Sequence, residues 1–177
     1  ISFNISAAHC RDLSLLAECR AFLAHFQPGR VALVLELTER ELLVANPHTL
    51  SLFAQLDEMG VKLAIDDFGT GHSSLIYLQQ FHVDYLKIDR SFIGRIGTES
   101  LSEHIVDNVI DLGRRLGLAL VAEGVETEHQ AAYLRGKGVH YLQGFLFARP
   151  QPLRQFCQGL TAGEADSQPV AGRAASA

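Results

Sequence analysis

The chain has 177 residues, a net charge of -5, and 47% hydrophobic against 20% charged residues, which is typical of one globular domain with a sizeable core. Such an acidic chain is not expected to bind DNA or RNA, because a nucleic-acid backbone calls for a basic stripe. No apolar run approaches the roughly 18 residues of a membrane-spanning helix. Three scattered cysteines fit a reduced compartment, so we expect a cytoplasmic location.

Short β-branched and aliphatic runs alternate along the chain with longer amphipathic stretches. The runs predict six strands, at residues 1–6, 30–37, 61–67, 84–89, 118–124 and 139–145. The stretches between them predict helices at residues 13–26, 39–59 with a break at Asn46-Pro47, 73–81, 99–117 and 127–137, with a short helix after Pro152. Three glycines, Gly60, Gly117 and Gly138, stand where a helix should stop before the next strand.

Strands that alternate with helices at this spacing indicate an α/β fold with a parallel sheet. The strand runs are largely continuous in apolar residues, as expected of parallel strands covered by helices. Residues 160–177 are small, polar and aperiodic, which predicts a disordered tail or linker after a folded domain at residues 1–159.

Polar side chains stand at or near the end of every predicted strand. They are Asn4, Glu36, Asp66 with Asp67, Lys87 with Asp89, Glu123 and Gln143. The carboxyl ends of parallel strands meet on one face, and active sites of α/β proteins are built there. The sequence therefore predicts that these residues converge on one site.

The carboxylates of this set predict a metal centre. Four of them cannot share a pocket as bare anions, because neighbouring like charges raise each other's pKa. Hard oxygen ligands without His or Cys favour Mg²⁺ or Mn²⁺ over zinc. The adjacent pair Asp66-Asp67 would let one carboxylate bridge two metals about 3.5–4 Å apart. Lys87 is either a snorkelling surface lysine or, as its neighbours favour, a group that holds an attacking water or neutralises a phosphoryl group.

Five motifs in order now resemble the EAL domain of bacterial cyclic di-GMP phosphodiesterases. They are "ELTE" (36–39), "DDFGTGHSSL" (66–75), "LKID" (86–89), "AEGVE" (122–126) and "QGFLFARP" (143–150). The resemblance covers roughly residues 1–156. It implies a modified TIM-like (β/α)₈ barrel, of which this chain supplies about six strands, and hydrolysis of cyclic di-GMP to linear pGpG with two Mg²⁺ or Mn²⁺ ions. We expect Ca²⁺ to inhibit, because its longer bonds misplace the attacking group.

The resemblance also implies a role for each matching residue. The metal ligands it implies are Asn4, Glu36, Asp66, Asp67 (the bridging candidate) and Glu123. Lys87 resembles the lysine that activates the attacking water, and Gln143 resembles the glutamine that helps to orient that water and contacts the substrate.

Further substrate contacts are implied at Asp89, Glu126 and Phe145. Glu39, counted among the catalytic candidates, resembles the residue that anchors the loop after Asp67.

In this family the loop after Asp67 links metal binding to dimerisation, so a homodimer through this loop is implied. The Glu-Ala-Leu motif that names the family lies upstream of "NIS" and is not in this sequence, so we interpret the chain as an N-terminally truncated piece. In the parent protein a GGDEF or sensory domain is expected upstream, and the parent could be membrane-tethered with this domain on the cytoplasmic side.

Two other functions remain open at this point. The first is a catalytically inactive cyclic di-GMP receptor, although the intact "ELTE", "DDFG" and "AEGVE" motifs favour an active parent. The second is a metal-dependent carbon-acid enzyme on a TIM barrel, which also places carboxylates and a lysine at strand ends. That class does not require the Asp-Asp pair or the "QGFLFARP" run.

Overall fold

The computed structural model describes residues 1–12, 14–27, 29–39, 46–70, 78, 80–98 and 101–155, apart from the side chains of residues 101–103. The chain divides into two compact units, Ile1–Phe147 and Ala148–Ala177. In the second unit the described residues form a short helical turn at 153–155, where a short helix is predicted. The predicted tail at residues 160–177 lies outside the described part of the chain, and the predicted domain boundary at residue 159 stays a prediction.

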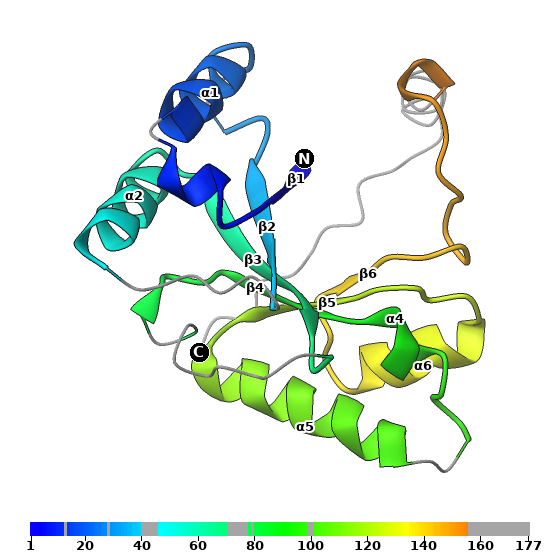
Figure 1. Ribbon diagram of the computed structural model, residues 1–177. Helices are drawn as coiled ribbons and strands as arrows, with labels where there is room; N and C mark the ends of the chain where they lie inside the picture. Colours follow the sequence, from blue (N-terminus) through cyan, green and yellow to red (C-terminus); the bar gives the residue numbers. More distant parts are fainter. Residues whose placement is uncertain are drawn as a thin grey trace, which may run out of the picture. The chain divides into compact units, whose positions relative to one another are not determined.

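Six parallel strands form one sheet in chain order within the first unit (Figure 1). They are β1 (Ser2–Ile5), β2 (Val34–Thr38), β3 (Lys62–Phe68), β4 (Tyr85–Ile88), β5 (Ala119–Ala122) and β6 (Tyr141–Leu142). The predicted parallel α/β sheet is therefore confirmed. The sixth strand is much shorter than the predicted 139–145. The Gln143 N–H still donates to the Ala122 carbonyl of β5, but beyond it the chain bonds Val125 in the loop after β5 and leaves the sheet ladder.

Helices and short helical turns connect the strands. They are η1 (His9–Arg11), α1 (Ser14–Leu23), α2 (Pro47–Glu58), α4 (Arg90–Ile93), α5 (Leu101–Leu116) and α6 (Glu128–Gly136). Most of the helix predicted at 73–81 lies outside the described residues. Among the described helices, none is long and apolar enough to cross a membrane.

Helix α2 begins at Asn46-Pro47, where the sequence predicts a break within residues 39–59. Asn46 caps it: the Asn46 side chain accepts from the Thr49 N–H at 3.0 Å, and the Thr49 hydroxyl accepts from the Asn46 N–H at 3.0 Å. Pro47 follows at the first helical position, where its missing N–H costs nothing. Glu39 lies in a turn, and residues 40–45 fall outside the described part. The break predicted at Asn46-Pro47 is thus the start of the helix.

The helix ends agree better with the sequence. Gly60 follows α2 at a φ of 77° and Gly117 follows α5 at a φ of 70°, a region that residues with a Cβ rarely adopt. The short helix α4 is not among the predicted helices. Its first turn is held by Asp89, whose carboxylate accepts the Ser91 N–H at 2.9 Å.

The two faces of the sheet differ in burial. Alternate strand residues on one face, such as Leu35, Leu86 and Leu120, are almost fully buried and form a single core with side chains of the helices. The other face borders an open hollow of about 240 Å³ that contains Glu36 and Lys87. The prediction that helices cover the strands is therefore right for one face of the sheet only. The second face carries the polar residues.

Gly144 packs directly against the main chain of the loop after β5. A Cβ at this position would lie 2.1 Å from the Val125 carbonyl oxygen and 2.3 Å from its nitrogen. The Val125 N–H donates to the Gln143 carbonyl and the Leu146 N–H donates to the Val125 carbonyl, both at 3.0 Å. Neither segment can retreat without loss of these bonds.

We therefore expect Gly144→Ala to lower the free energy of unfolding by about 2–3 kcal/mol through overpacking. Urea-induced unfolding followed by circular dichroism measures this change. Gly136→Ala is the matched control, because a Cβ at this position of α6 meets no heavy atom within 4 Å apart from its chain neighbours and the backbone of its own helix. It should leave stability unchanged or raise it by up to about 1 kcal/mol. Equal effects of the two variants would contradict a tight contact at Gly144.

Candidate active site

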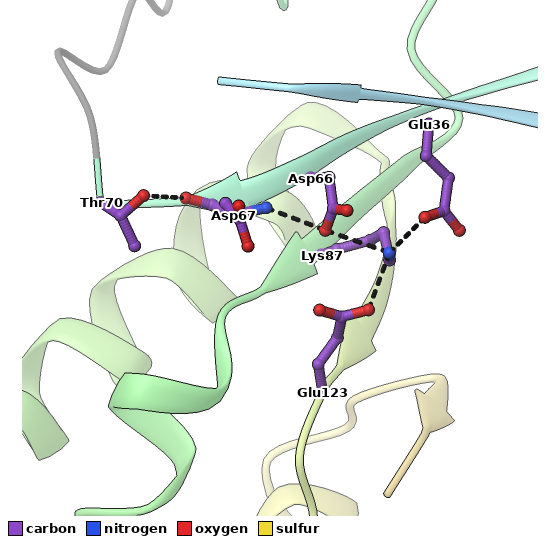
Figure 2. Close-up of polar contacts among 6 residues, drawn as sticks. All are labelled: Glu36, Asp66, Asp67, Thr70, Lys87 and Glu123. Carbon is purple, nitrogen blue, oxygen red and sulfur yellow. Dashed lines mark hydrogen bonds and ion pairs between the residues drawn. The ribbon is translucent and has the colours of Figure 1, made fainter. Parts of the chain in front are cut away.

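Lys87 is the centre of the polar cluster on the open face of the sheet. Its Nζ lies 2.6 Å from Glu36 Oε2, 2.7 Å from Glu123 Oε1 and 3.0 Å from Asp66 Oδ1 (Figure 2). Only 6% of the Lys87 side chain is exposed, so it is not a snorkelling surface lysine. The structure thus brings together four of the predicted strand-end residues.

The sheet register explains why these side chains meet. Lys87 is on β4, between β3, which carries Asp66, and β5, which Glu123 follows directly. Glu36 is on β2, one strand further along the sheet. Because side chains of a strand alternate between the two faces, these four point to the same side, while neighbours such as Leu35, Ile65 and Leu86 enter the core.

Burial and charge oppose each other at Lys87. Burial alone would lower the pKa of its ammonium group, but hydrogen bonds with Glu123, Glu36 and Asp66 outweigh this and raise the pKa above its ordinary value. Lys87 therefore stays positively charged at neutral pH. Burial raises the pKa of Glu123, and the hydrogen bond from Lys87 only partly offsets that effect.

Three carboxylates form a group of the size that holds a metal ion. Asp66, Asp67 and Glu123 each offer one oxygen, and these oxygens lie within 4.8 Å of one another. Burial, with the nearby charge of Asp66, raises the pKa of Asp67, as expected where anions crowd. The donor set consists of hard oxygens, which suits a divalent cation such as Mg²⁺ or Mn²⁺. These residues could therefore hold a metal ion.

The structure does not bring the whole predicted ligand set into this group. The Glu36 carboxylate bonds Lys87, and Glu36 lies outside the three-carboxylate cluster. Asn4 is exposed on β1, where it is paired in register with Glu36. Metal ligation by Asn4 and Glu36 stays a prediction.

Asp67 has an unusual backbone conformation. Its φ is 54°, and it is the only residue other than glycine with a positive φ among the described residues. The register between β3 and β4 shifts at this point. The Asp67 N–H donates to Asp66 Oδ1 at 2.9 Å, and the Thr70 hydroxyl donates to the Asp67 carbonyl at 2.9 Å (Figure 2). A strained residue held by such bonds is typical of functional sites.

Glu39 ties the end of β2 to the loop after Asp67. Its backbone N–H donates to the Asp66 carbonyl at 3.0 Å, and its Oε2 accepts the Gly69 N–H at 2.8 Å. The anchoring role implied for Glu39 stays a prediction. The glycine is needed because its φ is 95° and a Cβ would lie 3.1 Å from the Phe92 ring.

The other predicted residues lie near the site with fewer described contacts. Gln143 lines the hollow together with Glu36 and Lys87. Burial would raise the pKa of Asp89, but hydrogen bonds from Ser91 outweigh it and lower that pKa.

Glu126 is exposed, and its described bond is a backbone one, from its N–H to Gln130 Oε1 at 2.8 Å. Phe145 is 51% exposed. The substrate contacts assigned to Asp89, Glu126, Gln143 and Phe145 stay predictions.

A second layer of residues lines the hollow beneath the cluster and is missed by the sequence analysis. It comprises Val34, Ala64, Tyr85, Val121 and Tyr141. Each stands two residues before a predicted site residue, which lies on the same strand or directly after it. The two-residue period of a β-strand is the signal that would have found them.

A parallel α/β sheet with a helix-covered face, and a lysine among carboxylates at the strand ends of the other face, defines the class. It is a protein of the TIM-like barrel type with an acidic, metal-capable site.

The chain belongs to the EAL domain family, which matches residues 1–150. Probable cyclic di-GMP phosphodiesterase PdeN of Escherichia coli (strain K12) is 46% identical over 157 residues, which are 89% of this chain and 30% of PdeN. Cyclic di-GMP phosphodiesterase PdeL of the same strain is 42% identical over 156 residues, 88% of this chain and 43% of PdeL. This chain thus spans less than half the length of these curated relatives. The family predicted from the five motifs is confirmed.

The fold has solved counterparts. The PaMucR phosphodiesterase of Pseudomonas aeruginosa, solved as a c-di-GMP complex, has a TM-score of 0.77 and 42% sequence identity, and the match covers 88% of this chain and 69% of that one. The predicted TIM-like fold class is therefore confirmed.

Proposed function

We propose that this protein is a metal-dependent phosphodiesterase that hydrolyses cyclic di-GMP to linear pGpG. The observation that carries the proposal is the convergence of Lys87 with Glu36, Asp66 and Glu123 at the strand ends of an EAL domain. Relatives named cyclic di-GMP phosphodiesterases support the choice of substrate.

In this proposal Asp66, Asp67 and Glu123 would hold the metal, and Asp67 is the candidate for the ligand shared between two ions. Asn4 and Glu36 complete the ligand set. Two Mg²⁺ or Mn²⁺ ions would neutralise the excess of carboxylates and supply Lewis-acid activation.

Lys87 donates a hydrogen bond to the attacking water or to the phosphate, and Gln143 orients the water. Asp89, Glu126, Gln143 and Phe145 contact the substrate. The half-exposed ring of Phe145 has a face on which a guanine can stack.

The proposal extends to partners. The loop after Asp67, which Glu39 holds at Gly69, would form the interface of a homodimer. A GGDEF or sensory domain upstream in the parent protein would regulate turnover, and the curated relatives are longer than this chain, as such a domain requires. We place the protein in the cytoplasm, where cyclic di-GMP acts.

The test is incubation of the protein with cyclic di-GMP and Mg²⁺ or Mn²⁺, followed by chromatography for pGpG. Formation of pGpG supports the proposal. Tight binding of intact cyclic di-GMP without pGpG would identify a receptor. Neither binding nor hydrolysis would exclude cyclic di-GMP as the ligand and return the carbon-acid enzyme to consideration.

The Glu39 carboxylate gives a graded prediction. Glu39→Ala removes the acceptor of the Gly69 N–H, so the loop that carries Asp67 loosens, and we expect kcat to fall by about 10- to 100-fold. Glu39→Gln keeps an oxygen acceptor and should retain most of the turnover. Initial rates of pGpG formation measure both variants. A Glu39→Gln variant as slow as Glu39→Ala would show that the charge of Glu39, and not its bond to Gly69, matters.

A further inference from the structure

The Lys87 ammonium group has as many hydrogen-bond acceptors around it as it has N–H donors. A lysine ammonium has three N–H donors and no acceptor. Three carboxylate oxygens, from Glu36, Asp66 and Glu123, lie 2.6 to 3.0 Å from its Nζ. Figure 2 shows the three contacts reaching one nitrogen, from Glu36 on β2, from Asp66 on β3 and from Glu123 directly after β5. Every donor of Lys87 thus has a charged partner.

Two of these partners also belong to the metal-capable group. Asp66 and Glu123 each contribute an oxygen to the cluster with Asp67. Lys87 and a metal ion therefore draw on the same pair of carboxylates. A divalent cation at these oxygens would stand close to a buried ammonium, and like charges repel strongly where little water screens them.

The three carboxylate partners of Lys87 are largely buried, which strengthens the competition between Lys87 and a metal ion for them. The side chains of Glu36, Asp66 and Glu123 are 12%, 13% and 20% exposed. Carboxylates removed from water to this extent need a counter-charge, and removal of one partner from a buried ion pair is strongly destabilising. Within the described cluster, Lys87 is the group that supplies it.

We propose that Lys87 is the resident counter-ion of the metal-free site, and that a divalent cation must displace its ammonium group from Asp66 and Glu123 in order to bind. The inference rests on the metal-dependent part of the proposed function. It gives Lys87 a role in metal loading that is separate from any contact with water or substrate. Metal binding and release of the ammonium group are then a single exchange, so that the lysine becomes available for the reaction only when the metal is present.

The proposal predicts opposite effects of one substitution on two quantities. Lys87→Met keeps the length and apolar stem of the side chain but leaves the carboxylates without their counter-charge. The metal-free protein should therefore melt at a lower temperature. The metal no longer competes with an ammonium group, so its affinity should rise, and saturating metal should recover the lost melting temperature.

The experiment is calorimetric titration of the protein with Mg²⁺ and with Mn²⁺ alone, without nucleotide, alongside thermal melts with and without metal. We expect the dissociation constant of Lys87→Met to be at least about tenfold lower than that of the unchanged protein. A lysine that only activates water predicts no such gain. Unchanged or weaker metal binding by Lys87→Met would overturn the inference.

Two control variants separate charge from general damage. Lys62, the first residue of β3, is another paired lysine of the same sheet, and its Nζ lies 2.9 Å from Asp84 Oδ1. Lys62→Met should leave the metal affinity unchanged. Lys87→Arg keeps the positive charge and should not bind metal more tightly than the unchanged protein. A gain in affinity with either control would overturn the role of the Lys87 charge.

A second measurement does not depend on whether Lys87→Met folds. In the unchanged protein, the side-chain ¹⁵N resonance of Lys87, assigned by its loss in Lys87→Arg, should shift as Mg²⁺ is added. A resonance that stays fixed at saturating Mg²⁺ would contradict the displacement. Lack of any Mg²⁺ or Mn²⁺ binding would refute the proposed metal-dependent function itself, whereas normal binding with no Lys87 response refutes this inference alone.

Discussion

Asp67→Asn is expected to lower kcat for cyclic di-GMP hydrolysis by about a thousandfold or more, while the protein stays folded. The amide is nearly isosteric with the carboxylate but lacks the negative charge needed to bridge two cations. Asparagine also tolerates the positive φ of 54° at this position, whereas alanine would add backbone strain to the loss of charge.

Rates of pGpG formation and thermal melts would be measured together for this variant. Asp111→Asn is the matched control, because Asp111 is an exposed carboxylate on α5, and its turnover should be normal. Normal kcat in Asp67→Asn would remove Asp67 from the site. An unfolded variant would assign it a structural role.

Exchange of the metal is expected to have an effect of similar size. Mg²⁺ or Mn²⁺ should support turnover, and removal of the metal with a chelator should abolish it, because the Lewis acid that the cluster of Asp66, Asp67 and Glu123 would hold is then lost. Ca²⁺ should bind the same oxygens at about 2.3–2.6 Å, against about 2.0–2.1 Å for Mg²⁺, and inhibit.

The measurement is a titration of Ca²⁺ into an assay at fixed Mg²⁺, with ionic strength held constant. The rate should fall with Ca²⁺ and recover with excess Mg²⁺, since the ions compete for one set of ligands. Turnover with Ca²⁺ equal to that with Mg²⁺ would contradict the proposed two-metal chemistry.

Local signals explain the parts of the fold that the sequence predicts. Short apolar runs place six strands and the amphipathic stretches between them place most of the helices, and Gly60 and Gly117 mark helix ends because the backbone there has a positive φ. The break predicted at Asn46-Pro47 coincides with the start of α2, because an Asn cap followed by Pro opens a helix. The helical stretch predicted before that break falls on residues 40–45, outside the described part of the chain.

The sequence by itself determined which residues could form the site, because polar side chains at the ends of apolar strands recur in order along the chain. Only the tertiary structure decided which carboxylates contact Lys87, which belong to the metal-capable cluster and which do both. Lys87 and Glu36 are 51 residues apart in sequence, and the twist and register of a six-stranded sheet place their charged groups 2.6 Å apart. The same register places the carboxylates of Asp66 and Glu123 in contact with Lys87 and also within the metal-capable cluster. No local pattern encodes these distances, since they depend on how strands distant in sequence pack against a common core.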